Sequence, residues 1–457
     1  MTFEEYLRAL RGRTMDVIGI GVSNRPLLRL LAQAGANVVA HDKKTAEQLG
    51  EIVSELRELG VRTVLGEEYL NCLEGEIVFR TPGLRPDHPA LEAARARGAE
   101  VTSEMEVFFD LCPCTLIAVT GSDGKTTTTT VISEMLKAAG KTVWLGGNIG
   151  APLLDQTGKM CPEDFAVLEL SSFQLMSMNK TPHIAVITNL SPNHLDWHRD
   201  MEEYIDAKCH IFRRQGPGDI LVLNYDNEPS RPLAEQAKGE VRFFSRAGAK
   251  EARVRLENGV IVDGKEPLFP ASEIRIPGVH NVENYMTACA ALRDIISPEI
   301  MARVAREFAG VEHRLELVRE LDGVRWYNDS IGSSPTRTLA GLHCFSERVI
   351  LIAGGYDKHV PFDGLGAAIP QHVKTLLLCG ATAEKIETAV KQAPDYRDGS
   401  PVILHFTRLD DAVTAARELA KPGDVVLFSP ACASFDQFPN FMVRGRYFKD
   451  KVNELQE

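Results

Sequence analysis

Short runs of apolar, mostly β-branched residues alternate along the chain with longer stretches in which apolar residues recur every three or four positions. The short runs are typical of buried strands, and the longer stretches are typical of amphipathic helices. Their alternation predicts an α/β fold with mainly parallel sheets. The expected strands are residues 15–19, 37–40, 115–120, 165–170, 184–188, 220–223, 324–327, 349–353, 375–378 and 425–428.

These runs form three blocks, and 457 residues are too many for one ordinary core. We expect a Rossmann-like N-terminal domain over residues 1–112, since a strand, a glycine turn, a helix and a second strand follow one another there. A central P-loop ATPase domain with a mainly parallel sheet is expected over 113–311. A Rossmann-like C-terminal domain is expected over 312–457.

Composition narrows the classes of function. The net charge of -12 argues against a nucleic-acid partner, because no excess of cations is present to neutralise phosphates. The nine cysteines show neither CxxC pairs nor metal-binding spacing, which favours free thiols in a reducing compartment. The acidic, amphipathic start is unlike a signal peptide, and no run of about 18 apolar residues occurs. We therefore expect a cytoplasmic protein that does not bind a membrane.

One segment carries clear phosphate-binding chemistry. The apolar run 115–120 leads directly into Gly-Ser-Asp-Gly-Lys-Thr-Thr, although Val119 stands where the usual P-loop has its first glycine. Such a turn points several backbone N–H groups at one anion, and the helix that follows adds its dipole. A lysine there reaches the terminal phosphates and a threonine hydroxyl ligates Mg²⁺. The predicted nucleotide-binding residues are Gly121, Ser122, Asp123, Gly124, Lys125, Thr126 and Thr127.

A strand that runs into this form of the loop resembles the Mur ligases and their relative folylpolyglutamate synthase. Further segments resemble Mur ligase motifs and occur in the same order. They are Gly147-Asn-Ile-Gly150, Leu168-Glu-Leu-Ser-Ser-Phe-Gln-Leu175, Thr188-Asn-Leu-Ser-Pro-Asn-His-Leu-Asp196, Gly278-Val-His-Asn-Val-Glu-Asn284 and Glu312-His-Arg314. The resemblance covers about residues 15–448. The Rossmann-like first domain argues against folylpolyglutamate synthase.

The resemblance implies an ATP-dependent ligase of peptidoglycan precursor synthesis. ATP would phosphorylate a substrate carboxylate, and an amine would then attack the acyl phosphate. Two Mg²⁺ ions are implied, with Thr126, Glu169, His194 and a carbamylated Lys208 as ligands, and Lys125, Glu169, His194 and Lys208 as catalytic residues. The other residues implied for ATP are Asn281, Asn284, Arg314 and Asp329, the last two from the third domain.

The first domain carries the second predicted site. By its residues alone, the turn Gly19-Ile-Gly-Val-Ser-Asn24 followed by Asp42 is similar to a dinucleotide site. The third glycine of that motif is missing, and no hydride chemistry is visible downstream. The resemblance implies a UDP-sugar site instead, formed by Gly21, Val22, Ser23, Asp42, Lys43, Lys44, Thr81, Pro82, Gly83, Asn148 and His194.

The C-terminal segments Gly354-Gly-Tyr-Asp-Lys358 and Leu427–Phe438 resemble those of the family members that add D-glutamate to UDP-N-acetylmuramoyl-L-alanine. A cation with oriented donors suits a dicarboxylate acceptor. The resemblance implies D-glutamate contacts from Lys358, Ser333, Ser434 and Phe441. Only small-molecule partners and a monomer are expected.

Two departures leave alternatives open. Residues 330–336 lack the lysine and asparagine found in many D-glutamate-adding ligases, and Asn193 replaces the usual aspartate before the histidine. A sister ligase for L-alanine, a diamino acid or a dipeptide is one alternative, although the DNPR motif of the diaminopimelate-adding enzyme is absent. An enzyme that accepts L-glutamate and a non-catalytic nucleotide-binding protein are the others.

Overall fold

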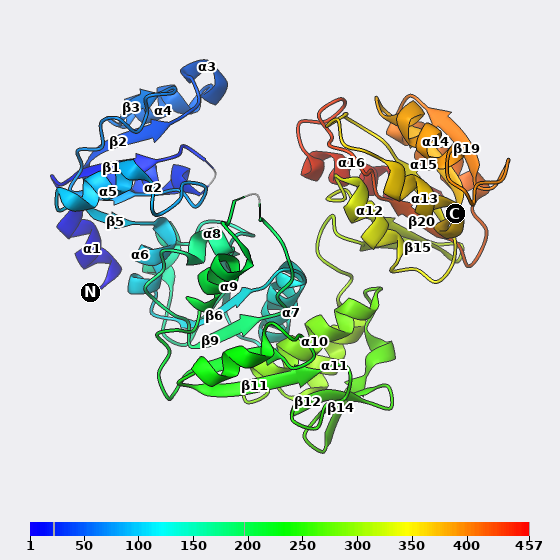
Figure 1. Cartoon of the computed structure of the whole chain (residues 1–457), viewed down its shortest axis with the longest axis horizontal. Helices are drawn as coiled ribbons and strands as arrows, with labels where there is room; N and C mark the ends of the chain where they lie inside the picture. The colour runs from blue at the N-terminus through cyan, green and yellow to red at the C-terminus, as the bar shows by residue number, and fades with distance from the viewer. Residues whose placement is uncertain (22, 196, 457) are drawn as a thin grey trace. The chain divides into compact units, whose positions relative to one another are not determined.

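The computed structural model describes residues 1–21, 23–195 and 197–456 and contains three separate sheets (Figure 1). Most strand pairs are parallel, so the predicted α/β class with mainly parallel sheets is confirmed. Each sheet falls within one of the three blocks of the sequence. None of the helices in the described part of the chain has both the length and the apolar character that a membrane span requires.

The first sheet has the strand order β3-β2-β1-β4-β5 and is parallel throughout. Helices α2 and α4 pack on one face through Leu28 and Leu56, and α5 packs on the other through Leu91. The elements are α1 (Phe3–Leu10), β1 (Thr14–Ile18), α2 (Asn24–Gln33), β2 (Asn37–Asp42), α3 (Ala46–Leu49), α4 (Ile52–Glu58), β3 (Arg62–Leu65), β4 (Ile77–Phe79), α5 (Pro89–Ala96), β5 (Glu100–Thr102) and α6 (Glu104–Leu111).

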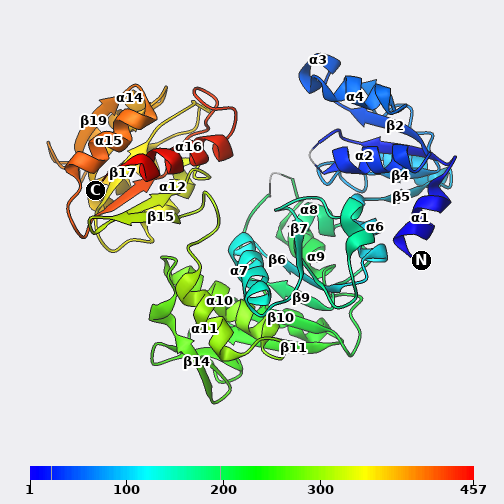
Figure 2. The ribbon, with the colours of Figure 1, turned by 180° about the vertical axis from the view of Figure 1, so that it is seen from behind.

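The second sheet has the order β14-β13-β12-β11-β10-β9-β6-β8-β7 and ends in an antiparallel meander. Figure 2 shows α7 on the face opposite to α8 and α9. The strands are β6 (Thr115–Thr120), β7 (Val143–Gly147), β8 (Phe165–Glu169), β9 (Ile184–Ile187), β10 (Ile220–Asn224), β11 (Glu240–Ser245), β12 (Val254–Glu257), β13 (Val260–Asp263) and β14 (Glu266–Pro270). The helices are α7 (Lys125–Ala138), η1 (Leu154–Lys159), α8 (Ser172–Leu175), α9 (Met201–Cys209), η2 (Arg231–Gln236), η3 (Ala271–Glu273), α10 (Val279–Leu292) and α11 (Pro298–Glu307).

The third sheet has the order β15-β16-β20-β17-β18-β19, and only its β15–β16 pair is antiparallel. Helices α12, α13 and α14 pack on one face, and α15 and α16 pack on the other. The elements are β15 (Glu316–Leu321), β16 (Val324–Asn328), α12 (Pro335–Leu342), β17 (Val349–Ala353), α13 (Asp363–His372), β18 (Val373–Cys379), α14 (Ala383–Lys391), β19 (Val402–Phe406), α15 (Leu409–Leu419), β20 (Val425–Phe428) and α16 (Phe441–Glu454).

The chain divides into two compact units. The first comprises Met1–Ala271 with Glu283–Val304, and the second comprises Ser272–Val282 with Ala305–Glu457. Within the first unit, one hydrophobic core includes residues of both sheets, such as Phe79 and Leu168. The domain bounds 1–112, 113–311 and 312–457 stay a prediction.

The order of strands determines where ligand-binding loops can form. In the second sheet β6 lies between β8 and β9, and all three are parallel. Their carboxyl ends therefore share one edge, which is where parallel α/β sheets bind ligands. The loops that begin at Gly121, Leu170 and Thr188 leave the sheet at this edge.

A buried carboxyl group joins α6 to η1. Glu104, the first residue of α6, is only 8% exposed and accepts a 3.2 Å hydrogen bond from the backbone N–H of Leu154. Burial raises the pKa of Glu104 from 4.5 to about 7. Because η1 follows the loop that holds Asn148, this contact anchors a predicted substrate-binding segment.

We predict that Glu104→Gln changes how stability depends on pH. The folded protein keeps a proton on Glu104 that the unfolded chain loses between pH 4.5 and about 7, so this group lowers stability as the pH rises through that window. The loss amounts to about 3 kcal/mol at most. Denaturant unfolding at pH 5 and pH 8 should show the variant gaining stability relative to the wild type at pH 8. An equal difference at both pH values would contradict a buried, proton-binding Glu104.

Candidate functional site

The predicted phosphate loop forms the turn between β6 and α7. Gly124 has φ of +76° and is the N-cap of α7, so the loop takes a left-handed conformation that favours glycine. The end of β9 supports the loop, because Asn189 accepts a 3.0 Å hydrogen bond from Asp123 N and Thr188 donates one of 2.6 Å to Asp123 O. Thr126 and Thr127 lie in the first turn of α7.

Two lysine side chains meet at one backbone carbonyl of this loop. Lys125 Nζ donates to Gly121 O at 3.0 Å and to Ser122 O at 2.8 Å. Lys208 Nζ donates to the same Gly121 O at 2.8 Å and lies 3.2 Å from Thr120 Oγ1. Lys208 is 1% exposed, although its helix pattern alone is that of a surface lysine. Burial first, and then the charge of Lys125, lower the pKa of Lys208 well below its usual value.

A buried carboxylate lies at the neighbouring strand end. Glu169 is 2% exposed, and its Oε1 accepts a 2.9 Å hydrogen bond from Asn148 Nδ2. Its Oε2 has no hydrogen-bond partner among the described residues. An unpaired buried carboxylate oxygen is costly unless a cation or another donor satisfies it. This oxygen therefore fits the predicted role of Glu169 as a Mg²⁺ ligand.

Among the residues that the structure describes, no three His, Cys, Asp or Glu side chains cluster closely enough to hold a metal ion by themselves. His194 is exposed, has φ of +54°, and has its ring centroid 5.0 Å from that of Phe173. Asp196 of the same motif lies outside the described residues.

The two predicted nucleotide-binding asparagines lie on α10, and both are 5% exposed. Asn284 Oδ1 accepts a 3.2 Å hydrogen bond from Thr128 Oγ1, and a Cβ on Gly124 would overlap this oxygen. Asn284 therefore packs against the phosphate loop. Asn281 belongs to the second unit, where its Nδ2 donates to Pro277 O at 2.5 Å.

In the predicted UDP site, Asp42 holds the turn of residues 19–24 that follows β1. Its carboxylate accepts hydrogen bonds from Ile20 N at 2.7 Å and Lys44 N at 2.9 Å. Asn24, which the sequence analysis did not single out, is buried and donates to Ile18 O and Gly19 O at 2.9 and 3.1 Å. Asparagine at such a turn is a signal for local hydrogen bonding.

Of the remaining predicted UDP-binding residues, those of the first domain lie in the loops after β1, β2 and β4, whereas Asn148 and His194 lie in loops of the second sheet. A Cβ on Gly19 would come within 3.2 Å of Thr81, so the loops after β1 and β4 approach each other. Pro82 is half-buried, whereas Gly21, Ser23, Lys43, Lys44, Gly83 and Asn148 are exposed. Val22 lies outside the described residues.

In the second unit, Asp329 follows β16 and is 5% exposed. Its Oδ2 accepts a 2.7 Å hydrogen bond from Ser429, and its Oδ1 accepts one from Leu315 N at 3.3 Å. Burial raises the pKa of Asp329 to about 6. These contacts hold the segment of Arg314, which is half-buried, against the sheet.

Three of the predicted D-glutamate residues, Ser333, Lys358 and Ser434, lie in loops of the third sheet, and Phe441 is the first residue of α16. Lys358 is exposed, Ser434 is 2% exposed, and Ser333 and Phe441 are half-buried. A bridge between Tyr356 and Ala433 joins the two loops that carry Lys358 and Ser434.

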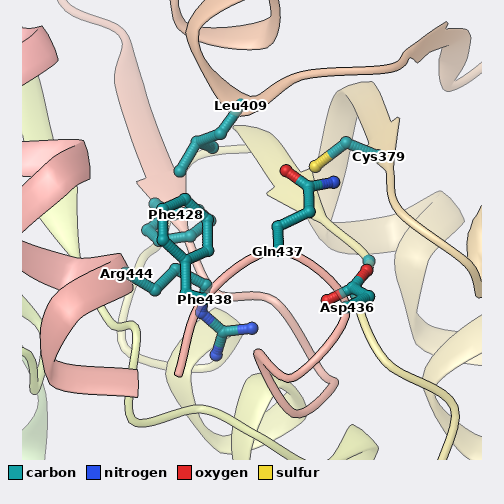
Figure 3. Close-up of a pocket in the computed structure, with 9 residues that line it drawn as sticks. Cys379, Leu409, Phe428, Asp436, Gln437, Phe438 and Arg444 are labelled. Atoms are coloured by element: carbon teal, nitrogen blue, oxygen red, sulfur yellow. The ribbon is translucent and has the colours of Figure 1, made fainter. Parts of the chain in front are cut away.

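Arg444 ties these loops to the end of β16. It is 3% exposed and donates to Cys432 O, Ala433 O and Ser330 O at 2.9–3.0 Å. Figure 3 shows Arg444 beside Phe428 and Phe438 in a pocket. The residues lining this pocket are Gly354, Gly355, Cys379, Leu409, Phe428, Asp436, Gln437, Phe438 and Arg444.

Comparison with known proteins agrees with this architecture. Family models match in two places: the Mur ligase middle domain at residues 119–292 and the Mur ligase glutamate ligase domain at residues 313–432. A protein named UDP-N-acetylmuramoylalanine–D-glutamate ligase from Acetivibrio thermocellus is 50% identical over 459 residues, which cover 99% of this chain and 98% of the relative. The protein of the same name from Ruminiclostridium cellulolyticum is also 50% identical, over 99% of both chains.

The chain belongs to the Mur ligase family. Solved Mur ligases share its fold at lower identity. The UDP-N-acetylmuramate-alanine ligase MurC from Thermotoga maritima is 19% identical with a TM-score of 0.58, over 96% of this chain and 99% of that one. MurF from Acinetobacter baumannii is 15% identical with a TM-score of 0.57, over 97% and 92% of the two chains.

We predict that Gly124→Ala weakens nucleotide binding by this Mur ligase. An alanine at φ of +76° costs about 1–2 kcal/mol, and its Cβ would displace Asn284. Titration with ATP should show a dissociation constant raised by roughly tenfold or more. Gly218→Ala is the matched control, because a Cβ there meets open space. Unchanged ATP affinity in Gly124→Ala with an intact circular dichroism spectrum would contradict this role of the loop.

Proposed function

We propose that this chain is an ATP-dependent ligase that joins D-glutamate to UDP-N-acetylmuramoylalanine. Two relatives at 50% identity over nearly the full length carry that activity in their names. The main structural support for the proposal is at the edge of the second sheet where the parallel strands β6, β8 and β9 end. There the phosphate loop, the unpaired Glu169 oxygen and the buried Lys208 come together.

ATP would phosphorylate the carboxylate of the acyl substrate, and the amine of D-glutamate would attack the acyl phosphate and release phosphate. Phosphoryl transfer depends mainly on positioning and on neutralising the charge of phosphate oxygens. Lys125 and the N-terminus of α7 supply positive charge for that purpose. Asn148 and His194 would hold the acyl substrate. Mg²⁺ with Thr126, Glu169, His194 and modified Lys208 as its ligands would supply further neutralisation when bound.

Lys208 is suited to carbamylation. Its lowered pKa favours the neutral amine, whose nitrogen lone pair can add to CO₂ with loss of one proton to give a carbamate. The carbamate replaces a potential cation with an anion. That change would remove the repulsion with Lys125 and provide an oxygen ligand close to the phosphate loop.

The second unit would bind the nucleotide through Arg314 and Asp329 and the amino acid through Lys358, Ser333, Ser434 and Phe441. The carboxylate next to Lys358 in sequence, that of Asp357, already pairs with Lys385. Lys358 would therefore pair with a carboxylate of D-glutamate. Arg444 would keep the surrounding loops in place.

We propose that the enzyme works as a monomer in the cytoplasm on these small molecules. All nine cysteines are free in the structure, which supports a reducing compartment.

The proposal is tested by phosphate release from ATP in the presence of UDP-N-acetylmuramoyl-L-alanine, Mg²⁺ and bicarbonate. D-glutamate, L-glutamate, L-alanine and meso-diaminopimelate are supplied one at a time as acceptors. We expect release only with D-glutamate, and we expect Lys125→Met to lower it by about a hundredfold or more. Lys141→Met, at an exposed position just after α7, is the control.

Release with a different acceptor would keep the ligase chemistry and overturn the specificity. No release with any acceptor, together with intact ATP binding, would favour a nucleotide-binding protein without ligase activity.

A further inference from the structure

An arginine of the first sheet makes a forked ion pair with a helix of the second sheet. Arg85 lies in the segment after β4, two residues beyond the predicted UDP-binding turn 81–83. Its Nη2 donates to Glu203 Oε1 at 2.8 Å and its Nη1 to Glu203 Oε2 at 3.2 Å. The same guanidinium donates to Trp197 O at 3.1 Å and lies 5.0 Å from the centroid of the Trp197 ring. Forked arginine–carboxylate pairs fix orientation as well as distance.

The acceptor of this ion pair lies on the helix that carries Lys208. Glu203 is in the first turn of α9, and Lys208 is in its last turn. The Glu203 side chain is 16% exposed, and its hydrogen bond with Arg85 lowers the pKa of Glu203 to about 2. Glu203 is therefore ionised at neutral pH, and one helix, α9, carries both this ion pair and Lys208.

A buried histidine extends the chain of contacts to the segment of Glu169. The side chain of His198 is fully buried, its Nδ1 lies 3.5 Å from Glu203 Oε2, and its Nε2 lies 2.9 Å from Ser172 Oγ. Its ring is parallel to that of Phe173, with centroids 5.7 Å apart. Ser172 begins α8, three residues after Glu169. The contacts thus connect the predicted UDP-binding turn 81–83 with the helix of Lys208 and with the segment that follows Glu169.

A second arginine connects the same segment to α8 rather than to α9. Arg80 is 2% exposed and donates from Nη2 to Phe173 O at 2.9 Å and to Ser177 Oγ at 2.8 Å. Its Nη1 donates to Leu84 O at 2.9 Å within its own loop. The predicted UDP-binding turn therefore lies between two arginines: Arg80 contacts α8 and the residue Ser177 beyond it, and Arg85 contacts α9.

We propose that Arg85, through Glu203 and His198, is a positioning residue that couples occupancy of the nucleotide end of the substrate to the geometry of Lys208 and Glu169. This inference rests on the proposed function, because it assigns the nucleotide to the turn 81–83 and catalysis to the second sheet. In this proposal Arg85 is not assigned to the substrate carboxylate, the phosphate or the D-glutamate amine that react. Its effect is to convert binding energy from the remote UDP group into correct placement of the catalytic side chains.

The coupling is measured by comparing two substrates in wild type and Arg85→Met. One is UDP-N-acetylmuramoyl-L-alanine and the other is N-acetylmuramoyl-L-alanine, which lacks the nucleotide. For the full substrate we expect kcat/KM to fall by roughly tenfold or more, with part of the loss in kcat. For the truncated substrate we expect a change of less than about twofold, because no nucleotide binding energy is available to be transmitted.

Arg85→Lys should recover only part of the lost kcat/KM, since lysine keeps the positive charge but cannot make the bidentate pair with Glu203. Glu203→Gln should reproduce the pattern of Arg85→Met. The control is Arg13→Met, which removes a 2.9 Å ion pair with Glu76 at the opposite end of the same first sheet. Equal losses on both substrates, or no loss on either, would overturn the coupling.

A readout without turnover separates this inference from the proposed reaction. Backbone hydrogen exchange in α9, which Arg85 contacts and Arg80 does not, is followed with and without UDP alone. We expect UDP to slow exchange there in the wild type and in Arg13→Met, but not in Arg85→Met. The absence of slowing in the wild type, or the same slowing in Arg85→Met, would overturn the coupling. Failure of D-glutamate-dependent phosphate release in the wild type would instead overturn the proposed function and leave this exchange result to stand by itself.

Discussion

The carbonyl oxygen of Gly121 is the point on which the candidate site depends, because the side chains of both Lys125 and Lys208 donate to it. Two ammonium groups brought to one buried oxygen repel each other, and burial penalises the charge of Lys208 further. A site of this kind is stable when one lysine is neutral or is converted to an anion. The lowered pKa of Lys208 makes this lysine, in the proposed function, the one that gives up its charge, while Lys125 would bind the phosphate.

The other residues of the site follow from the position of β6 between β8 and β9. Parallel strands bring the phosphate loop, Glu169 and the Thr188–Asn189 corner to one edge, so that no long loop has to span the site. The first sheet belongs to the same compact unit, and the segment after its strand β4 contacts α8 through Arg80 and α9 through Arg85. In the proposed function, these polar contacts would join the substrate-binding loops of the first sheet to the catalytic loops of the second.

The sequence predicted the features that depend on local pattern. Continuous apolar runs predicted β6, β8, β17 and β20 nearly to the residue, because buried parallel strands have no polar face. The meander β12–β14 was not predicted, although Asn258-Gly259 and Asp263-Gly264 are signals of tight hairpin turns. Burial of Lys208 and the Arg85–Glu203 pair could not be predicted from pattern, since their partners lie about 90 to 120 residues away in sequence. Only the packing of strands in space brings such residues together.

The most direct test of this account asks whether Lys208 carries a carbamate. NMR of the protein in isotopically labelled bicarbonate should show a carbamate carbonyl resonance in the wild type and in Lys141→Met, and this resonance should be missing from Lys208→Met. That result would establish that conversion of Lys208 to an anion relieves the electrostatic repulsion between the two lysines at Gly121. A wild type without the resonance, or a Lys208→Met variant that retains it, would contradict the central role assigned to this lysine.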